Sequence, residues 1–211
     1  MTEGIEHTVV DLYRRHGAAW ARLRGESLPE REWLDRFCAL LPAGAEVLDI
    51  GCGAGVPIAR HLAARKFIVT GLDAAPEMLA MFRRNLPGSV AVLGDMRQMA
   101  LGRRFSGLLA WDSFFHLCPD DQRGMFQRFA DHAAPGAALM FTSGPGEGSA
   151  IGELQGEPLY HSSLGPDEYR DLLHKSGFHV VEHIAEEPVC QRTIWLARRV
   201  QQAAGAKERR R

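Results

Sequence analysis

Three aspartates that recur near the ends of apolar runs are the residues of this sequence best suited to chemistry. The first, Asp49, lies in the run 46–50 and precedes glycines at positions 51, 53 and 55. Glycine has no Cβ, so a turn of this kind lets a ligand press against bare backbone. Residues 56–65 then look helical. An apolar strand, a glycine-rich turn and a helix predict a nucleotide-type site at the carboxyl end of a parallel strand.

The second and third aspartates also lie at the ends of apolar runs. Asp73 ends the run 66–73, about 20 residues after the glycine turn, where nucleotide-binding folds place a carboxylate that accepts both ribose hydroxyl protons. Asp73 can also cap the helix expected over residues 76–84, and the two roles are compatible. Asp95 ends the run 90–95, with an ordinary turn aspartate as the alternative.

The spacing of the glycines narrows the choice of ligand. A dinucleotide-binding turn has the pattern G-x-G-x-x-G, and Val56 stands where its third glycine would fall. A phosphate-binding loop ends in Lys-Ser/Thr, which this turn lacks. The segment 49–55, Asp-Ile-Gly-Cys-Gly-Ala-Gly, instead resembles the first motif of the class I S-adenosylmethionine-dependent methyltransferases, D/E-x-G-x-G-x-G. A purely structural glycine turn in another α/β protein is the alternative.

The resemblance implies S-adenosylmethionine as the cofactor and S-adenosylhomocysteine as its product. In this family the acid at Asp95 meets the exocyclic amine of adenine, and Met96 packs on the ring, to which a thioether is well suited. An arginine in the leading helices can pair with the methionyl carboxylate. Core packing is the alternative for the aromatic residues of those helices. The implied cofactor site consists of Tyr13, Trp20, Arg24, Asp49, Gly51, Cys52, Gly53, Asp73, Ala74, Met78, Asp95, Met96, Trp111 and Asp112.

Residues just after the fourth apolar run, 105–111, lie beside the transferable methyl group in the same family. A general base is needed only if the methyl acceptor carries a proton at neutral pH. His116 is then the expected base, with His161 as a second choice and Asp112 orienting the substrate or the base. A satisfied core histidine is the alternative for His116. Expected substrate contacts are Ser113, Tyr160 and His161, and no metal is expected.

The elements that must position these residues follow from the periodicity. Strands and helices alternate from residue 46 to residue 144, which predicts a parallel sheet with helices on both faces. Two apolar runs, 178–186 and 191–198, look like a terminal hairpin. Methyltransferase sheets of this family end in this way. The expected fold is a three-layer, doubly wound α/β sheet of seven strands, mostly parallel, with an antiparallel C-terminal hairpin.

The chain is expected to divide into three parts. Residues 1–41 form an N-terminal helical cap, and residues 42–198 form the methyltransferase domain. Residues 199–211 form a basic tail that we expect to be disordered. Within the domain, residues 144–165 are rich in glycine and read as a flexible loop. Loops of this length in compact domains are usually functional, so we interpret this one as a substrate lid, with a plain surface loop as the alternative.

Composition limits the partners. The formal net charge of the 211 residues is −1, which argues against a nucleic-acid or membrane surface. No apolar run is long enough to span a bilayer. The four cysteines, at positions 38, 52, 118 and 190, are far apart, which suggests neither a zinc site nor a disulfide framework and fits a cytoplasmic setting. The expected partner is a small-molecule substrate, with the protein a monomer or homodimer.

The sequence therefore predicts an S-adenosylmethionine-dependent methyltransferase acting on a small molecule. A non-catalytic S-adenosylmethionine-binding or regulatory subunit is the alternative. An inactive relative is expected to lose the strand-end acids, whereas Asp49, Asp73 and Asp95 are all present. A nicotinamide-dependent oxidoreductase is disfavoured by Val56 and by the terminal hairpin.

Overall fold

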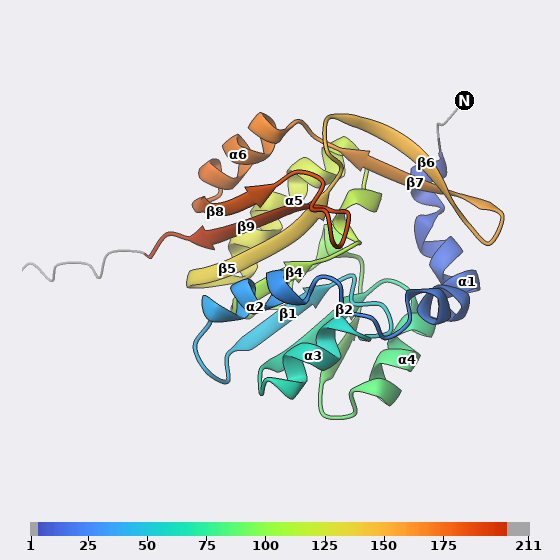
Figure 1. Ribbon diagram of the computed structural model, residues 1–211, viewed down its shortest axis with the longest axis horizontal. Coiled ribbons are helices and arrows are strands. Elements are labelled where there is room, and N and C mark those ends of the chain that lie inside the picture. The colour runs from blue at the N-terminus through green and yellow to red at the C-terminus, as the bar shows by residue number, and fades with distance from the viewer. Residues whose placement is uncertain (1–3, 202–211) are drawn as a thin grey trace, which may run out of the picture.

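A computed structural model describes residues 4–201 of the chain. Its main feature is a seven-stranded sheet with the order β3-β2-β1-β4-β5-β9-β8 (Figure 1). The first five of these strands are parallel, and β9 lies antiparallel between β5 and β8. The strands are β1 (Glu46–Ile50), β2 (Ile68–Asp73), β3 (Val90–Leu93), β4 (Phe105–Ala110), β5 (Ala133–Ser143), β8 (Phe178–Ile184) and β9 (Thr193–Arg199). The predicted seven-stranded, mostly parallel sheet with an antiparallel ending is confirmed.

Helices cover both faces of the sheet. Neighbouring residues of a strand point to opposite faces, so Leu139 and Phe141 join one buried apolar cluster and Met140 joins the other. The first cluster includes side chains of α5 and α6, and the second includes side chains of α2, α3 and α4. The longer helices are α1 (Val9–Arg24), α2 (Arg31–Ala39), α3 (Ile58–Ala64), α4 (Pro76–Asn85), α5 (Pro119–His132) and α6 (Pro166–Lys175).

The two N-terminal helices differ in how they pack. A Cβ placed on Gly107 of β4 would lie 2.8 Å from the Phe37 ring of α2, so α2 lies directly on the sheet as part of the core. By contrast, α1 follows a short 3-10 turn, η1 (Ile5–His7), and lies beyond the carboxyl ends of the strands. Within the cap expected over residues 1–41, only η1 and α1 lie over the carboxyl ends of the strands. Residues 1–3 of that cap lie outside the described part.

The segment 144–165 is not the flexible loop that its composition predicted. It forms an antiparallel pair of strands, β6 (Gly148–Leu154) and β7 (Glu157–Ser163). Gln155 and Gly156 make the turn between them, both with positive φ, as two-residue hairpin turns require. The hairpin is stabilised from outside, because the Glu157 carboxylate accepts hydrogen bonds from Arg15 and His16 of α1.

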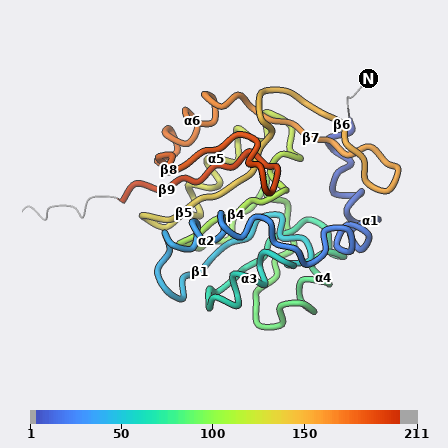
Figure 2. Tube along the Cα trace, in the orientation of Figure 1, coloured from blue at the N-terminus to red at the C-terminus, as the bar shows by residue number. Residues whose placement is uncertain are grey.

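η1, α1, β6 and β7 together form one unit, here named the cover. Figure 2 shows α1 and the hairpin side by side at one edge of the molecule. They share a small apolar cluster, separate from the two clusters of the sheet, whose buried members are Val9, Leu12, Leu154, Leu159 and Tyr160.

The C-terminal tail is described only in part. β9 extends to Arg199, so the first residue of the expected tail belongs to the sheet. Residues 202–211, on which the rest of that expectation falls, lie outside the described part. Within residues 4–201, none of the helices is both long and apolar enough to span a membrane.

Candidate active site

The glycine turn after β1 is shaped by close contacts. Its glycines, at positions 51, 53 and 55, have positive φ angles of 74°, 53° and 74°, a region that residues with a Cβ rarely adopt. A Cβ on Gly51 would lie 2.3 Å from that of Ser113, and one on Gly55 would lie 2.5 Å from a methyl of Leu86. The Gly51 N–H donates to the Leu72 carbonyl at 2.7 Å, which ties the turn to β2.

Asp73, at the end of β2, is held by backbone donors. One carboxylate oxygen accepts a hydrogen bond from Gly53 N–H and the other from Ala75 N–H, each at 2.8 Å. Burial raises its pKa, although these hydrogen bonds act in the opposite direction. Asp73 therefore orders both the glycine turn and the start of α4. Asp73 is not the N-cap of α4, because that position is held by Ala75 and no side chain caps the helix. The Asp73 carboxylate lines a cavity.

Asp49 is a buried carboxylate without a partner. Its exposed fraction is 4%, and its side chain makes no hydrogen bond or ion pair among the described residues. Burial, and then the nearby Asp73 carboxylate, raise its pKa to about 7. Burying an unpaired carboxylate is costly, and a cation placed beside it would relieve this cost. Asp49 also lines a cavity.

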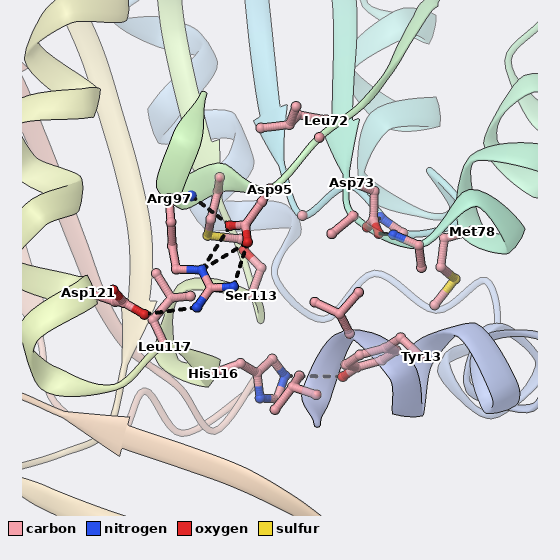
Figure 3. A pocket seen from close by; sticks show the side chains of 18 of the residues that line it. Tyr13, Leu72, Asp73, Met78, Asp95, Arg97, Ser113, His116, Leu117 and Asp121 are labelled. Carbon is pink, nitrogen blue, oxygen red and sulfur yellow. Dashed lines mark hydrogen bonds and ion pairs between the residues drawn. The ribbon is translucent and has the colours of Figure 1, made fainter. Parts of the chain in front are cut away.

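Asp95 is tied to a cation of the protein. Its carboxylate accepts the Arg97 backbone N–H at 2.8 Å and the Arg97 guanidinium at 2.6–3.0 Å, and Arg97 also donates to Asp121 at 3.1 Å (Figure 3). Although partial burial acts to raise it, these hydrogen bonds hold the Asp95 pKa below its ordinary value. Asp95 is therefore the N-cap of the short turn η2 (Met96–Gln98), as the turn alternative predicted, and it also lines the cavity of Asp73.

Most of the predicted site residues line two adjoining cavities at the carboxyl edge of the sheet. The first cavity is lined by Tyr13, Trp20, Gly51, Gly53, Asp73, Ala74, Met78, Asp95, Met96, Asp112, Ser113 and His116. The second cavity is lined by Trp20, Arg24, Asp49, Gly51, Cys52, Gly53, Trp111 and Asp112. The shared residues Trp20, Gly51, Gly53 and Asp112 form the boundary. Predicted site residues between positions 13 and 116 of the chain thus lie together at this edge of the sheet.

Two predicted contacts, Tyr160 and His161, are placed differently. Cys52 does line the second cavity, although its thiol is buried among apolar side chains and faces Gly71. Tyr160 packs within the cover, and its hydroxyl bonds to Ser149 at 3.1 Å. His161 lines neither of the two cavities and faces a third one. Neighbouring strand residues point to opposite sides, which separates these last two side chains.

His116 joins the cover to the sheet. Its Nδ1–H donates to the Tyr160 carbonyl at 2.8 Å, which leaves Nε2 as the acceptor for the Tyr13 hydroxyl at 3.1 Å (Figure 3). Burial is the main cause that lowers its pKa, to about 4, so the ring is neutral at neutral pH. Burial and the Asp112 carboxylate raise the pKa of Tyr13. Both ring nitrogens are satisfied, as the core-histidine alternative predicted, yet the ring lines the first cavity.

Asp112 follows β4 in a restrained conformation. Its φ is +48°, its N–H donates to Thr142 Oγ1 at 2.9 Å, and its carboxylate accepts two hydrogen bonds from Arg192 at 2.6 and 3.0 Å. Next to it, Ser113 donates its hydroxyl proton to the Ile50 carbonyl at 2.6 Å. The proton of Ser113 is thus used to hold the loop to β1.

The site contains two further charged residues, Arg192 and Glu30, which the sequence analysis did not identify. Arg192, in the turn before β9, clamps Asp112. Glu30 is almost fully buried and forms an ion pair with Arg24, which also donates to the Ser27 carbonyl at 2.8 Å. The sequence offers one signal for Glu30, which is that an acidic residue directly precedes the apolar face of α2. Nothing in the local sequence marks Arg192.

The fold and the site define a class of proteins that hold a nucleotide-like ligand at the carboxyl edge of a doubly wound sheet. Residues 47–136 match a family model described as a methyltransferase domain. The match covers 90 of the 211 residues and includes the glycine turn, Asp73 and Asp95.

The chain is similar to two sugar N,N-dimethyltransferases over 101 residues, 47% of its length. The dTDP-3-amino-3,6-dideoxy-alpha-D-glucopyranose enzyme of Streptomyces fradiae is 39% identical. The dTDP-3-amino-3,4,6-trideoxy-alpha-D-glucopyranose enzyme of Streptomyces venezuelae is 31% identical. The matched segment covers 39% and 42% of those two proteins, less than half of each.

A solved structure extends the likeness of fold over most of the chain. This is the S-adenosylmethionine-bound CalS10, an amino pentose methyltransferase from Micromonospora echinaspora involved in calicheamicin biosynthesis. The TM-score is 0.68 at 23% identity, over 87% of this chain and 95% of the other.

Proposed function

We propose that this protein is an S-adenosylmethionine-dependent methyltransferase that acts on a small molecule. The unpaired, buried Asp49 carboxylate carries this proposal, because it lies beside a glycine turn and needs a cation. An α-amino acid that bears an ammonium group meets this need. The Arg24 guanidinium lines the same cavity and is suited to the carboxylate of that amino acid.

The other site residues fit the rest of the cofactor. Asp73 has acceptor capacity left for ribose hydroxyl groups, and Asp95 and Met96 form the part of the first cavity suited to adenine. Ala74 and Met78 supply its apolar wall. When bound, S-adenosylmethionine supplies a methyl group on a sulfonium, which is already a good electrophile.

The residues of the chain then have to place a nucleophile in line, exclude water and take up a proton. Holding two reactants in such a geometry supplies much of the rate acceleration. Tyr13 and His116 are placed for the proton transfer by the hydrogen bond between them. The Tyr13 hydroxyl accepts the proton of the acceptor as it gives its own to Nε2 of the neutral His116 ring. The cover excludes water, and Asp112 orients the acceptor.

The names of the two sugar dimethyltransferases make amines the first acceptors to examine. We therefore propose a panel of amino sugars, with hydroxyl and carboxyl compounds as further arms, assayed by methyl transfer from labelled S-adenosylmethionine. Calorimetry with S-adenosylhomocysteine and with NAD precedes this assay. Binding of S-adenosylhomocysteine without any turnover across the panel would favour a non-catalytic binding subunit. No binding at tens of micromolar would refute the proposal.

We also propose a cytoplasmic setting and a monomer or homodimer. Four free cysteines, two buried and two partly exposed, fit a reducing compartment. Light scattering of the purified protein measures the oligomeric state directly.

A further inference from the structure

A third cavity lies beside the first two but shares no lining residue with them. It is formed where β5 ends, between the β6–β7 hairpin and the turn before β9. Its walls include Ser143, glycines 144, 146 and 148, His161 and Arg192. Two contacts connect it with the first cavity. The Asp112–Arg192 ion pair spans the boundary, and the His161 ring lies 4.8 Å from the His116 ring, centroid to centroid.

The third cavity offers hydrogen-bond donors and a positive charge. Arg192 is the one formally charged side chain among its described lining residues. Several serine hydroxyls at this wall are already used, since Ser162 donates to Leu117 and Ser163 to Leu164. The backbone N–H of Gly146 has no partner among residues 4–201.

Arg192 keeps donor capacity despite its ion pair. A guanidinium carries five N–H groups, and four hydrogen bonds are made here. Two go to Asp112 and two weaker ones go to the carbonyls of Cys190 and Gln191, at 3.4 and 3.1 Å. One N–H of Nη2 is left. The guanidinium is only partly buried, with 36% of the side chain exposed, so a ligand can reach it.

The first cavity has the opposite charge. Glu6, Asp73, Asp95, Asp112 and Asp121 line it, against one guanidinium, that of Arg97. A molecule that spans both cavities therefore meets carboxylates at one end and a guanidinium at the other. Such a field orients a ligand whose nucleophilic end is neutral or cationic and whose other end is anionic.

We propose that the third cavity binds the methyl acceptor by an oxyanion, a phosphate or a carboxylate, and that Arg192 selects for it. The proposal rests on the proposed methyltransferase function. The nucleophilic group of the acceptor lies toward Asp112 and the first cavity, while its oxyanion pairs with Arg192 and the free N–H of Gly146. Because Asp112 and the oxyanion compete for one guanidinium, Asp112 limits the affinity for anions.

The test measures anion binding by calorimetry to the full chain saturated with S-adenosylhomocysteine, at constant ionic strength. Inorganic pyrophosphate and succinate are the probes, one for each source of the oxyanion. Arg192→Gln removes the charge, and Asp112→Asn removes its competitor. Arg123→Gln is the matched control, since Arg123 pairs with Asp120 and Glu168 on an exposed surface.

The two site variants are expected to act in opposite directions. One probe binds the wild type, about tenfold more weakly after Arg192→Gln and about tenfold more tightly after Asp112→Asn, and equally after Arg123→Gln. The probe that binds more tightly identifies the oxyanion as phosphate or carboxylate. If the ion pair were purely structural, the wild type would bind neither probe, and Arg192→Gln would change nothing.

Equal affinity of the wild type and Arg192→Gln for both probes overturns the proposal, as does an unchanged affinity in Asp112→Asn. If Arg192→Gln does not fold, Arg192→Lys takes its place, because lysine keeps the charge but not the planar fork of donors and should bind the anion more weakly than the wild type. S-adenosylhomocysteine binding is measured in the same proteins. Its failure in the wild type refutes the proposed function, and anion binding to the ligand-free protein then decides the role of Arg192 separately.

Discussion

Replacing Asp49 with asparagine is expected to stabilise the ligand-free protein while weakening its affinity for S-adenosylhomocysteine. Asparagine has the shape of the carboxylate but cannot ionise. The buried Asp49 has a pKa of about 7 instead of the ordinary 3.8, a difference of about three units or roughly 4 kcal/mol. Because the folded-state pKa is the higher one, the folded protein binds more protons, and stability falls as the pH rises between these two values.

The expected signature is a pH-dependent difference in Tm. At pH 8 the wild type carries nearly the full cost of the ionised Asp49, and at pH 5 it carries a little over a third of this cost. At about 2–4 °C per kcal/mol for a chain of this size, the asparagine variant should melt roughly 10 °C higher than the wild type at pH 8 and only about 4 °C higher at pH 5. Scanning calorimetry without ligand measures both values. Glu153→Gln, at an exposed position of β6, is the control.

Ligand binding should reverse the order of the two proteins. An ammonium group beside Asp49 stabilises the carboxylate, so the variant should bind S-adenosylhomocysteine at least about tenfold more weakly. The affinity of the wild type should also fall below pH 7, as Asp49 takes up a proton, while that of the variant stays flat. A Tm difference that is equal at pH 5 and pH 8, or an unchanged affinity, would refute this account of the cavity.

Three further outcomes are expected from the geometry. Gly55→Ala should lower the unfolding free energy by about 2 kcal/mol or more, as measured by urea denaturation, since it combines a positive φ with a Cβ overlap at α4. Tyr13→Phe should leave S-adenosylhomocysteine affinity within about threefold and lower kcat at least about tenfold, because His116 loses its proton donor; an unchanged kcat would contradict the relay. Asp95→Asn should destabilise the protein at neutral pH and much less at pH 3, because a lowered pKa stabilises the folded state only while the carboxylate is ionised. Identical losses at both pH values would argue against the ion pair with Arg97.

The acids of the site were predictable because their order along the chain is also their order in space. Asp49, Asp73 and Asp95 lie on or just after parallel strands, and the carboxyl ends of such strands meet at one edge. The sequence could not reveal Arg192, since it meets Asp112 across 80 positions. Nor could it show which way the Cys52 thiol points.

The hairpin was missed for a different reason. Six of the seven residues of β6 are exposed, so the strand has no alternation of polar and apolar residues from which to read it. What holds it in place is tertiary contact, namely the apolar cluster of the cover and the ion pairs of Glu157 with α1. Local propensity favours a loop, and packing against α1 overrides it.

The separate apolar cluster of the cover has a consequence for the timing of the reaction. Opening the cover breaks the small cluster, the contacts of Glu157, the hydrogen bonds of His116 and those of Ser162 with Leu117 and Gln122, while both clusters of the sheet stay intact. Segments with few buried contacts open far more readily than the whole molecule unfolds. Residues of η1 and α1 form one wall of the first cavity, so we expect ligands to pass beneath them and product release, rather than methyl transfer, to limit the rate of each cycle.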